Sequence, residues 1–220
     1  MNISIEGKPA FAYINVTLEP GESMIAEPDA MANMDVGIEM KAKLNGNPFS
    51  ALSKKYLGKE SLIINHFTNT TSSPKRITLV QSTPGDIIEK VLNNESYCLQ
   101  PGSYIASTSG VSIGVKWAGI SSFIGGEGLF KLILSGTGSV LLGAYGGLIE
   151  KQIEGEYIVD SSHLVAYEPH MQLKTQLAGG IFSSFFGGEG FVTRVVGTGK
   201  IVIQTRSLSG LTGWLNRYLY

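Results

Sequence analysis

The sequence predicts an all-β protein built from repeated units, with one short helix at its C-terminal end. The first observation is a long internal repeat: residues 117–142 read WAGISSFIGGEGLFKLILSGTGSVLL, and residues 177–203 read LAGGIFSSFFGGEGFVTRVVGTGKIVI. Repetition on this scale indicates a duplicated supersecondary unit. The second is the alternation of apolar and polar residues with a period of two, which is typical of strands. The third is the presence of 28 glycines, which suit the tight turns of such a chain.

Composition limits the class of protein further. The chain has 220 residues, 43% hydrophobic and 16% charged, and its formal net charge is −1. This length and composition suit one β domain with a substantial core and exclude a disordered chain. The near-zero net charge argues against nucleic acid as a partner, because it gives no long-range attraction for phosphates. The single cysteine, Cys98, permits no intrachain disulfide, and its apolar Tyr-Cys-Leu context predicts a buried thiol.

The repeat predicts three units within one domain. We expect a single β domain over residues 1–208, with units at approximately 18–92, 93–153 and 154–208, followed by an amphipathic segment over 209–220. The first unit is the faintest copy, since its Gly-Lys-Glu-Ser stands where the later units have Gly-Gly-Glu-Gly. No linker or low-complexity tract separates the units, so a continuous core is expected.

Strands and turns are predicted from local patterns. Residues 130–134 (FKLIL) and 200–205 (KIVIQT) alternate as strands do, and the Gly-Thr-Gly tracts at 136–138 and 197–199 are predicted to be hairpin turns. The uncharged stretch 132–149 is too interrupted by glycine for a membrane-spanning helix, which favours a hairpin and a third strand.

Helical spacing occurs in two places. A short helix is predicted after Pro48, where Phe49, Leu52 and Tyr56 share a face. The stronger prediction is the tail, where apolar residues recur at i, i+3, i+4 and i+7: Leu211, Trp214, Leu215 and Tyr218.

The order of these motifs resembles a known family. LEPGES…GIEM, GVSIGVKW…GGEGLF and HLVAYE…GGEGFV, ending in IQTRS, together resemble the uncharacterised altered-inheritance-of-mitochondria (AIM) family over residues 1 to 208. The resemblance implies a TRAP-like fold, like that of the tryptophan-RNA-binding attenuation protein: a double-stranded β-helix or β-sandwich with three internal repeats. It implies no established catalytic activity, and eukaryotic members are linked to mitochondrial inner-membrane organisation. The N-terminal residues show no signal or transit peptide, which predicts a cytoplasmic protein.

The carboxylates of the repeated GGEG blocks are the first candidate ligands. Glu60, Glu127 and Glu189 stand at corresponding places in the three units. Three convergent carboxylates would bind a cation, whereas separate carboxylates would each pin their own turn by accepting backbone hydrogen bonds. The repetition favours the structural interpretation, because a fold retains duplicated folding elements.

The apolar loops before GGEG are the second candidate site. Two Gly-bounded loops carry large side chains that would be exposed unless something covers them: Phe123, Ile124, Phe182, Phe185 and Phe186. They either cap the chain's own core, contact another copy, or insert into a membrane surface. Trp214 in the tail has the same alternatives, since Trp suits a boundary between water and an apolar phase.

Motifs for chemistry are absent from the sequence. It has no phosphate-binding loop, no nucleophile elbow and no His pair with metal-ligand spacing around His66, His163 or His170. No cofactor is therefore expected. The sequence favours a non-catalytic scaffold that acts through protein contacts, as a homo-oligomer and in some settings at a membrane surface. The alternative is a small-ligand or metal-binding protein that uses the repeat carboxylates.

Overall fold

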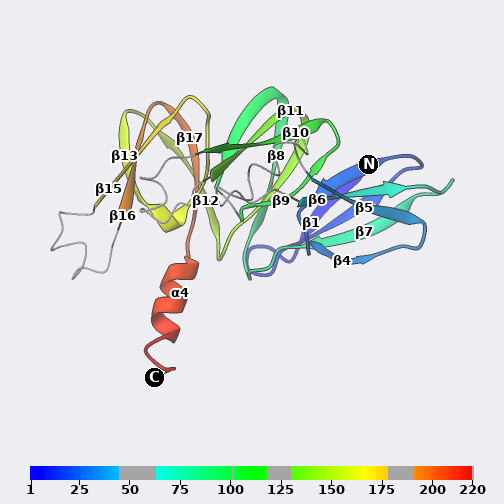
Figure 1. Ribbon diagram of the computed structural model, residues 1–220, viewed down its shortest axis with the longest axis horizontal. Helices are drawn as coiled ribbons and strands as arrows, with labels where there is room; N and C mark the ends of the chain where they lie inside the picture. The colour runs from blue at the N-terminus through cyan, green and yellow to red at the C-terminus, as the bar shows by residue number, and fades with distance from the viewer. Residues whose placement is uncertain (45–62, 101, 118–129, 178–190, 220) are drawn as a thin grey trace.

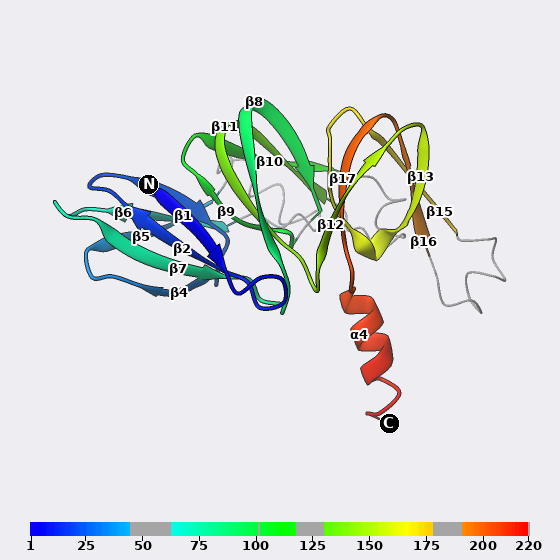
Figure 2. The same cartoon turned by 180° about the vertical axis from the view of Figure 1, so that it is seen from behind.

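The computed structural model describes residues 1–44, 63–100, 102–117, 130–177 and 191–219, and it is almost entirely β (Figure 1). The strands form three antiparallel sheets. The central sheet extends along the long axis, and a smaller sheet lies beside each of its ends, as Figures 1 and 2 show from opposite sides. The described chain contains one α-helix, α4 (Leu208–Leu215), and a single turn of 3-10 helix at Ser161–His163. The predictions of an all-β fold and of a C-terminal helix are confirmed.

The N-terminal sheet forms one end of the molecule. Its strands lie in the order β1 (Asn2–Glu6), β2 (Tyr13–Leu18), β7 (Lys75–Val80) and β4 (Met31–Met34). In β2 every second residue is fully buried, namely Ile14, Val16 and Leu18. This alternation places one face of the sheet on the core and the other in water.

The central sheet is the largest. Its order is β12 (Leu148–Ile153), β17 (Gly199–Gln204), β14 (Leu164–Tyr167), β8 (Ile87–Leu99), β11 (Phe130–Gly143), β9 (Tyr104–Thr108), β3 (Ser23–Ala26), β6 (Ile63–Asn69) and β5 (Ile38–Leu44), with β10 (Val111–Trp117) also pairing with β11. In β17, Ile201 and Val202 are both buried although they face opposite ways. This strand is therefore covered on both faces, as is usual only for interior strands.

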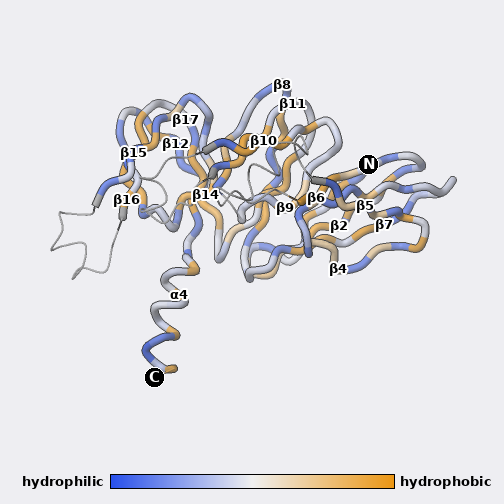
Figure 3. Tube along the Cα trace, viewed as in Figure 1, coloured by the Kyte–Doolittle hydropathy of each residue, from blue (hydrophilic) through white to orange (hydrophobic). Residues whose placement is uncertain are grey.

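A small third sheet closes the other end of the molecule. Its strands are β13 (Glu156–Asp160), β16 (Phe191–Val196) and β15 (Gln172–Leu177). Three clusters of buried apolar side chains fill the interior. Figure 3 shows apolar residues along the strands of all three sheets. Cys98 belongs to the third cluster and is 1% exposed, so the prediction of a buried thiol is confirmed.

The two Gly-Thr-Gly tracts do not form hairpin turns, so that prediction was wrong. The strand β11 continues through Gly136 and Gly138, with a register shift between Gly136 and Thr137 against β8. A Cβ on Gly136 would lie 2.3 Å from the Gly110 carbonyl oxygen, so glycine is required by close backbone approach. The second tract, Gly197 to Gly199, joins β16 and β17, which belong to different sheets.

Each of the three predicted units contains one antiparallel strand pair whose connecting segment lies outside the described residues. The pairs are β5 with β6, β10 with β11, and β15 with β16, and the segments are 45–62, 118–129 and 178–190. The helix predicted at 49–56 falls in the first of these segments. The three-unit organisation, its boundaries and the TRAP-like description stay predictions.

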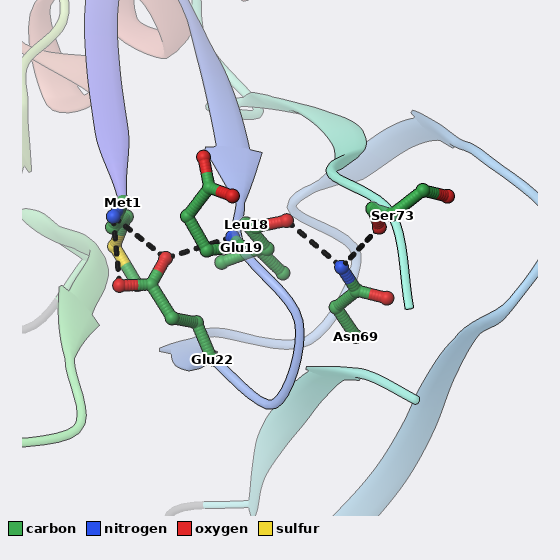
Figure 4. Close-up of polar contacts among 6 residues, drawn as sticks. All are labelled: Met1, Leu18, Glu19, Glu22, Asn69 and Ser73. Carbon is green, nitrogen blue, oxygen red and sulfur yellow. Dashed lines mark hydrogen bonds and ion pairs between the residues drawn. The ribbon is translucent and has the colours of Figure 1, made fainter. Parts of the chain in front are cut away.

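Two side chains organise the turns that join the N-terminal and central sheets (Figure 4). The fully buried Asn69 donates from Nδ2 to the carbonyl oxygens of Leu18 and Ser73, each at 2.9 Å. Its Oδ1 accepts from the backbone N–H and the hydroxyl of Thr71, at 3.0 and 2.8 Å. Asn69 thus satisfies backbone groups of its own turn and of Leu18, which lies 51 residues earlier in the chain.

Glu22 is the second of these side chains. Its carboxylate lies 2.7 Å from the amino group of Met1 and accepts from the backbone N–H of Glu19 at 2.9 Å. The hydrogen bond from the Met1 ammonium, followed by the one from Glu19, lowers the pKa of the Glu22 carboxyl below 4.5.

We expect Glu22→Gln to lower the free energy of unfolding by less than about 1 kcal/mol at pH 7, because the pair is partly exposed. A carboxyl whose pKa is lowered by folding contributes stability above its unfolded pKa and loses it as the pH falls through the folded pKa. The difference between the two proteins should therefore shrink below pH 4.5 in urea titrations. The control is Glu19→Gln. It removes a carboxylate from the same turn, and Figure 4 draws no contact between this carboxylate and the Met1 ammonium. An equal effect of both substitutions at pH 7 would contradict the ion-pair interpretation.

Candidate functional site

Of the sequence-predicted site residues, the described chain contains Trp214. The carboxylates Glu60, Glu127 and Glu189 lie in segments outside the described residues, and so do the apolar loop residues Phe123, Ile124, Phe182, Phe185 and Phe186. Whether these residues converge therefore stays a prediction. The candidate site is built from α4 and from the turns at its base.

The helix α4 is formed by a local sequence signal. Ser207 precedes it with an extended backbone, and its side chain accepts from the backbone N–H of Gly210 at 3.1 Å, as a helix N-cap does. The helix ends at Leu215, and the backbone N–H of Tyr218 donates to the Leu215 carbonyl at 2.9 Å in the turn that follows. The predicted apolar stripe thus extends one turn past the helix.

None of the described residues covers the apolar side of α4. The helix projects away from the sheets in Figures 1 and 2, and none of its residues is buried. The exposed fraction is 54% for Leu208, 54% for Trp214 and 71% for Tyr218. The Trp214 and Tyr218 rings contact each other, with centroids 5.1 Å apart. The α4 surface, defined as Leu208, Leu211, Trp214, Leu215 and Tyr218, is an uncovered apolar patch with two aromatic rings.

The base of α4 is held firmly by the turn between β11 and β12. The backbone N–H of Thr205 donates to Gly147 at 2.9 Å, and the Thr205 hydroxyl accepts from the Gly147 N–H at 2.8 Å. The Arg206 N–H donates to the Tyr145 carbonyl at 3.3 Å. Gly146 lies in the left-handed region with φ 80°, and a Cβ there would lie 2.6 Å from the Thr205 hydroxyl oxygen. The helix therefore starts from a fixed place on the sheet.

Backbone hydrogen bonds connect the turn at the base of α4 with the turn that contains the exposed Phe11. Gly146 accepts from the backbone N–H of Asp86 at 2.8 Å, and the carbonyl of Gly85 accepts from Ala12 at 2.9 Å. Ala12 follows Phe11, which is 73% exposed in the turn between β1 and β2. In both Figures 1 and 2 this dark blue turn and α4 lie on the same side of the molecule. Sequence reasoning missed Phe11, although a lone Phe between Gly-Lys-Pro-Ala and a strand was the available signal.

The charge around α4 differs from that of the whole chain. Residues 205–220 contain Arg206 and Arg217 and no acidic residue, whereas the chain has a net charge of −1. Lys8, in the turn that holds Phe11, lies 3.6 Å from Asp86 in an ion pair. The α4 surface is thus apolar, aromatic and locally cationic.

The side chains of His163 and His170 each contact a backbone carbonyl group. His163 Nδ1 lies 2.6 Å from the Gln204 carbonyl oxygen, and His170 Nε2 lies 2.8 Å from that of Thr198. Burial raises the pKa of the Cys98 thiol, which therefore stays protonated at neutral pH. Within the described ranges, no three His, Cys, Asp or Glu side chains are grouped so as to hold a metal ion. The part of the chain that the structure describes also contains no helix long and apolar enough to cross a membrane.

Fold and site together define an all-β protein with a projecting C-terminal helix. Comparison with known proteins then gives the family. The chain belongs to the mitochondrial biogenesis AIM24 family, whose model matches residues 3–206, which confirms the resemblance seen in the sequence. The match ends just before α4.

Two relatives come from Streptococcus pyogenes. An uncharacterized protein of serotype M6 is 25% identical over 228 residues, covering 100% of this chain and 91% of the relative. A solved crystal structure of a protein from the same species superimposes with a TM-score of 0.82 at 25% identity, over 99% of both chains. The whole described fold is thus shared with a solved structure.

Proposed function

We propose that the protein is a non-catalytic β scaffold that acts through protein contacts, and that α4 docks on a second copy of the chain. The observation that carries this proposal is the uncovered apolar side of α4. An isolated helix of eight residues is marginal in water, because its stability normally comes from packing an apolar face. The fixed base presents this face at one place on the surface, as a docking element requires. Twofold homodimers are the commonest soluble assemblies, so a second copy is the partner chosen.

The test is the mass of the protein in solution. We expect the intact chain to form a concentration-dependent dimer by size exclusion with light scattering, and a chain truncated after Ser207 to be monomeric. Trp214→Ser should weaken the dimer roughly 30-fold, the effect of a central aromatic contact worth about 2 kcal/mol. Because α4 buries none of its residues, the truncation should leave the thermal unfolding midpoint unchanged at concentrations where the intact chain is monomeric.

The matched control is Val91→Ser, which changes an apolar side chain that is 62% exposed on β8 and not part of the α4 surface. It should leave the dimer intact. A monomeric intact chain at high concentration, or a dimer that survives the truncation, would rule out self-association through α4.

A second candidate is contact with a membrane surface. It is favoured by the composition of residues 205–220, where Trp214 and Tyr218 accompany Arg206 and Arg217 without any acidic residue. The discriminating experiment is flotation with phosphatidylglycerol vesicles and with phosphatidylcholine vesicles. A monomer that floats only with anionic vesicles, and only with Trp214 present, would replace the dimer with a membrane contact.

The carboxylate hypothesis from the sequence is kept as an alternative proposal. Glu60, Glu127 and Glu189 occupy corresponding places in the three predicted units, which is the observation in its favour. Metal analysis of the purified protein and a thermal-shift screen with divalent ions test it, because a bound ion raises the unfolding temperature by mass action.

A further inference from the structure

The strand β5 forms one edge of the central sheet. It pairs with β6 on one side, and no described strand lies on its other side. Just before this ladder, the backbone N–H of Thr70 donates to the Gly37 carbonyl at 3.1 Å. Hydrogen-bonded pairs alternate along an antiparallel ladder, so the odd-numbered residues of β5 direct their backbone groups toward β6. Met40 and Ala42 therefore direct their backbone N–H and carbonyl groups outward, away from the sheet.

The two faces of β5 differ in character. Ile38 is buried, and Met40 and Ala42 follow it on the same face, where the Met40 side chain is 47% exposed. The opposite face carries the exposed side chains of Glu39 and Lys41, which form an ion pair at 2.9 Å. The strand β5 thus presents an open backbone edge with one apolar face and one face of two opposite charges.

An open edge strand is a template for pairing with another strand, and lysines on such an edge normally discourage it. On β5, however, the charge of Lys41 is matched two residues earlier by Glu39. Antiparallel pairing of β5 with a second copy of itself, about a twofold axis at Met40, places Glu39 of each copy opposite Lys41 of the other. On the apolar face, Ile38 of each copy then lies opposite Ala42 of the other. This register joins the outward backbone groups of both strands, as an antiparallel ladder requires.

The strand at the other edge of the central sheet, β12, lacks this self-complementarity. The backbone N–H of Thr205 donates to the Gly147 carbonyl just before its ladder with β17, so the even-numbered residues of β12 direct their backbone groups outward. The two central registers that this permits place either Glu150 opposite Glu150 or Lys151 opposite Lys151 of a second copy. Like charges directly opposite each other are destabilising. Charge therefore opposes self-pairing at β12 and favours it at β5.

We propose that β5 is an interface at which two copies of the chain extend the central sheet by antiparallel pairing of β5 with β5. Charge complementarity carries the proposal, since two pairs of Glu39 with Lys41 form across the axis while the two Met40 side chains lie side by side. A contact between two short strands is small, so we expect a Kd on the order of millimolar. The α4 contact would be tested at far lower concentrations, where β5 leaves the chain monomeric. Figures 1 and 2 show β5 and α4 in opposite halves of the molecule along its long axis, so the two contacts use separate surfaces.

Cross-linking through an introduced cysteine tests the proposal in the full chain. The single native cysteine, Cys98, is 1% exposed, so Met40→Cys adds an accessible thiol at the proposed axis. We expect a short bifunctional thiol reagent to join two Met40→Cys chains into a covalent dimer near millimolar protein. Ala42→Cys is the matched control, because this residue is exposed on the same face. The two Ala42 positions of the pair are about 14 Å apart along the strands, so the yield should be roughly fivefold lower.

Exchange of charges tests the register. Glu39→Lys and Lys41→Glu change exposed side chains, and each alone places like charges opposite each other across the axis. Either substitution should therefore lower the cross-linking yield of Met40→Cys roughly tenfold. An equimolar mixture of the two variant chains places opposite charges across the axis again, and it should recover most of the yield. Thermal unfolding of each variant alone checks that the fold is kept.

The same series in chains that carry Trp214→Ser separates this contact from the one proposed for α4. The yields should be unchanged, since β5 pairing does not involve α4. A loss of cross-linking in this background would assign the proximity of the two strands to the α4 contact and overturn the β5 interface. Absence of the Met40→Cys dimer, equal yields for Met40→Cys and Ala42→Cys, or no loss in either charge variant would also overturn it.

Discussion

Replacing Asn69 with alanine should destabilise the protein by about 3 kcal/mol, among the largest effects expected of a polar substitution in the described chain. The side chain makes four hydrogen bonds and is fully buried. Each such hydrogen bond contributes about 1 kcal/mol net to stability. A buried donor or acceptor that loses its hydrogen bond costs more than this. The carbonyl of Leu18, at the end of β2, would be among the groups left unsatisfied.

Urea unfolding at pH 7 measures the effect. The control is Asn15→Ala, because Asn15 is only half-buried and its amide donates to the exposed Glu6 carboxylate at 2.9 Å. That substitution should cost well under 1 kcal/mol. Asn69→Asp should be at least as harmful as Asn69→Ala at pH 7, since a carboxylate cannot donate to the carbonyl groups of Leu18 and Ser73. A loss below 1 kcal/mol for Asn69→Ala would show that water replaces these bonds.

Much of the fold was predictable because its signals are local. The alternation in β17 and the helical spacing around Trp214 depend only on neighbouring residues, and both predicted elements are present. The burial of Cys98 followed from its apolar neighbours. Family membership was also predictable, because it depends on the order of motifs along the chain.

The Gly-Thr-Gly tracts show where local reasoning fails. A glycine pair that suits a hairpin turn also suits a strand that passes close to another backbone, and the sequence does not distinguish these cases. At Gly136 the close neighbour is the carbonyl of Gly110, 26 residues earlier, which is a tertiary contact. Tertiary contact, not turn propensity, decides the conformation there.

The opposition of two lysines on paired strands was not predictable for a related reason. Lys116 and Lys131 lie 15 residues apart, and only the register of β10 and β11 places them opposite each other. A shift of one residue would move every side chain of a strand to the other face. The sequence likewise did not predict whether Trp214 is exposed, since a packed helix and an uncovered helix can have the same spacing of apolar residues.

Glu27 has the most unusual electrostatic environment of the described carboxyls. It follows β3, and its backbone N–H donates to the Ile105 carbonyl at 2.9 Å. Burial, together with the nearby charge of Asp29, raises the pKa of its carboxyl to about 7. The buried Tyr104, whose own pKa is raised chiefly by burial, lies close enough to be affected by the Glu27 charge. Among the described residues, no hydrogen bond to the Glu27 carboxyl offsets this burial.

This carboxyl should make the protein less stable as the pH rises. Between pH 4.5 and about 7 the folded chain keeps a proton on Glu27 that the unfolded chain has lost, so the free energy of unfolding decreases with pH. A rise of this size in pKa corresponds to at most about 3 kcal/mol, and the partial exposure of Glu27 reduces this to about 2 kcal/mol. The sign is opposite to that at Glu22, where ionisation favours the folded state.

Glu27→Gln should therefore stabilise the protein by about 2 kcal/mol at pH 8 and have almost no effect at pH 4. Urea unfolding of both proteins across this range measures the difference. Asp29→Asn is the matched control: it removes the secondary charge, and asparagine tolerates the positive φ of 65° at this position. It should give a smaller gain at high pH, because burial remains the larger cause of the raised pKa. A gain from Glu27→Gln that is equal at pH 4 and pH 8 would mean that packing, and not the buried charge, limits stability at this turn.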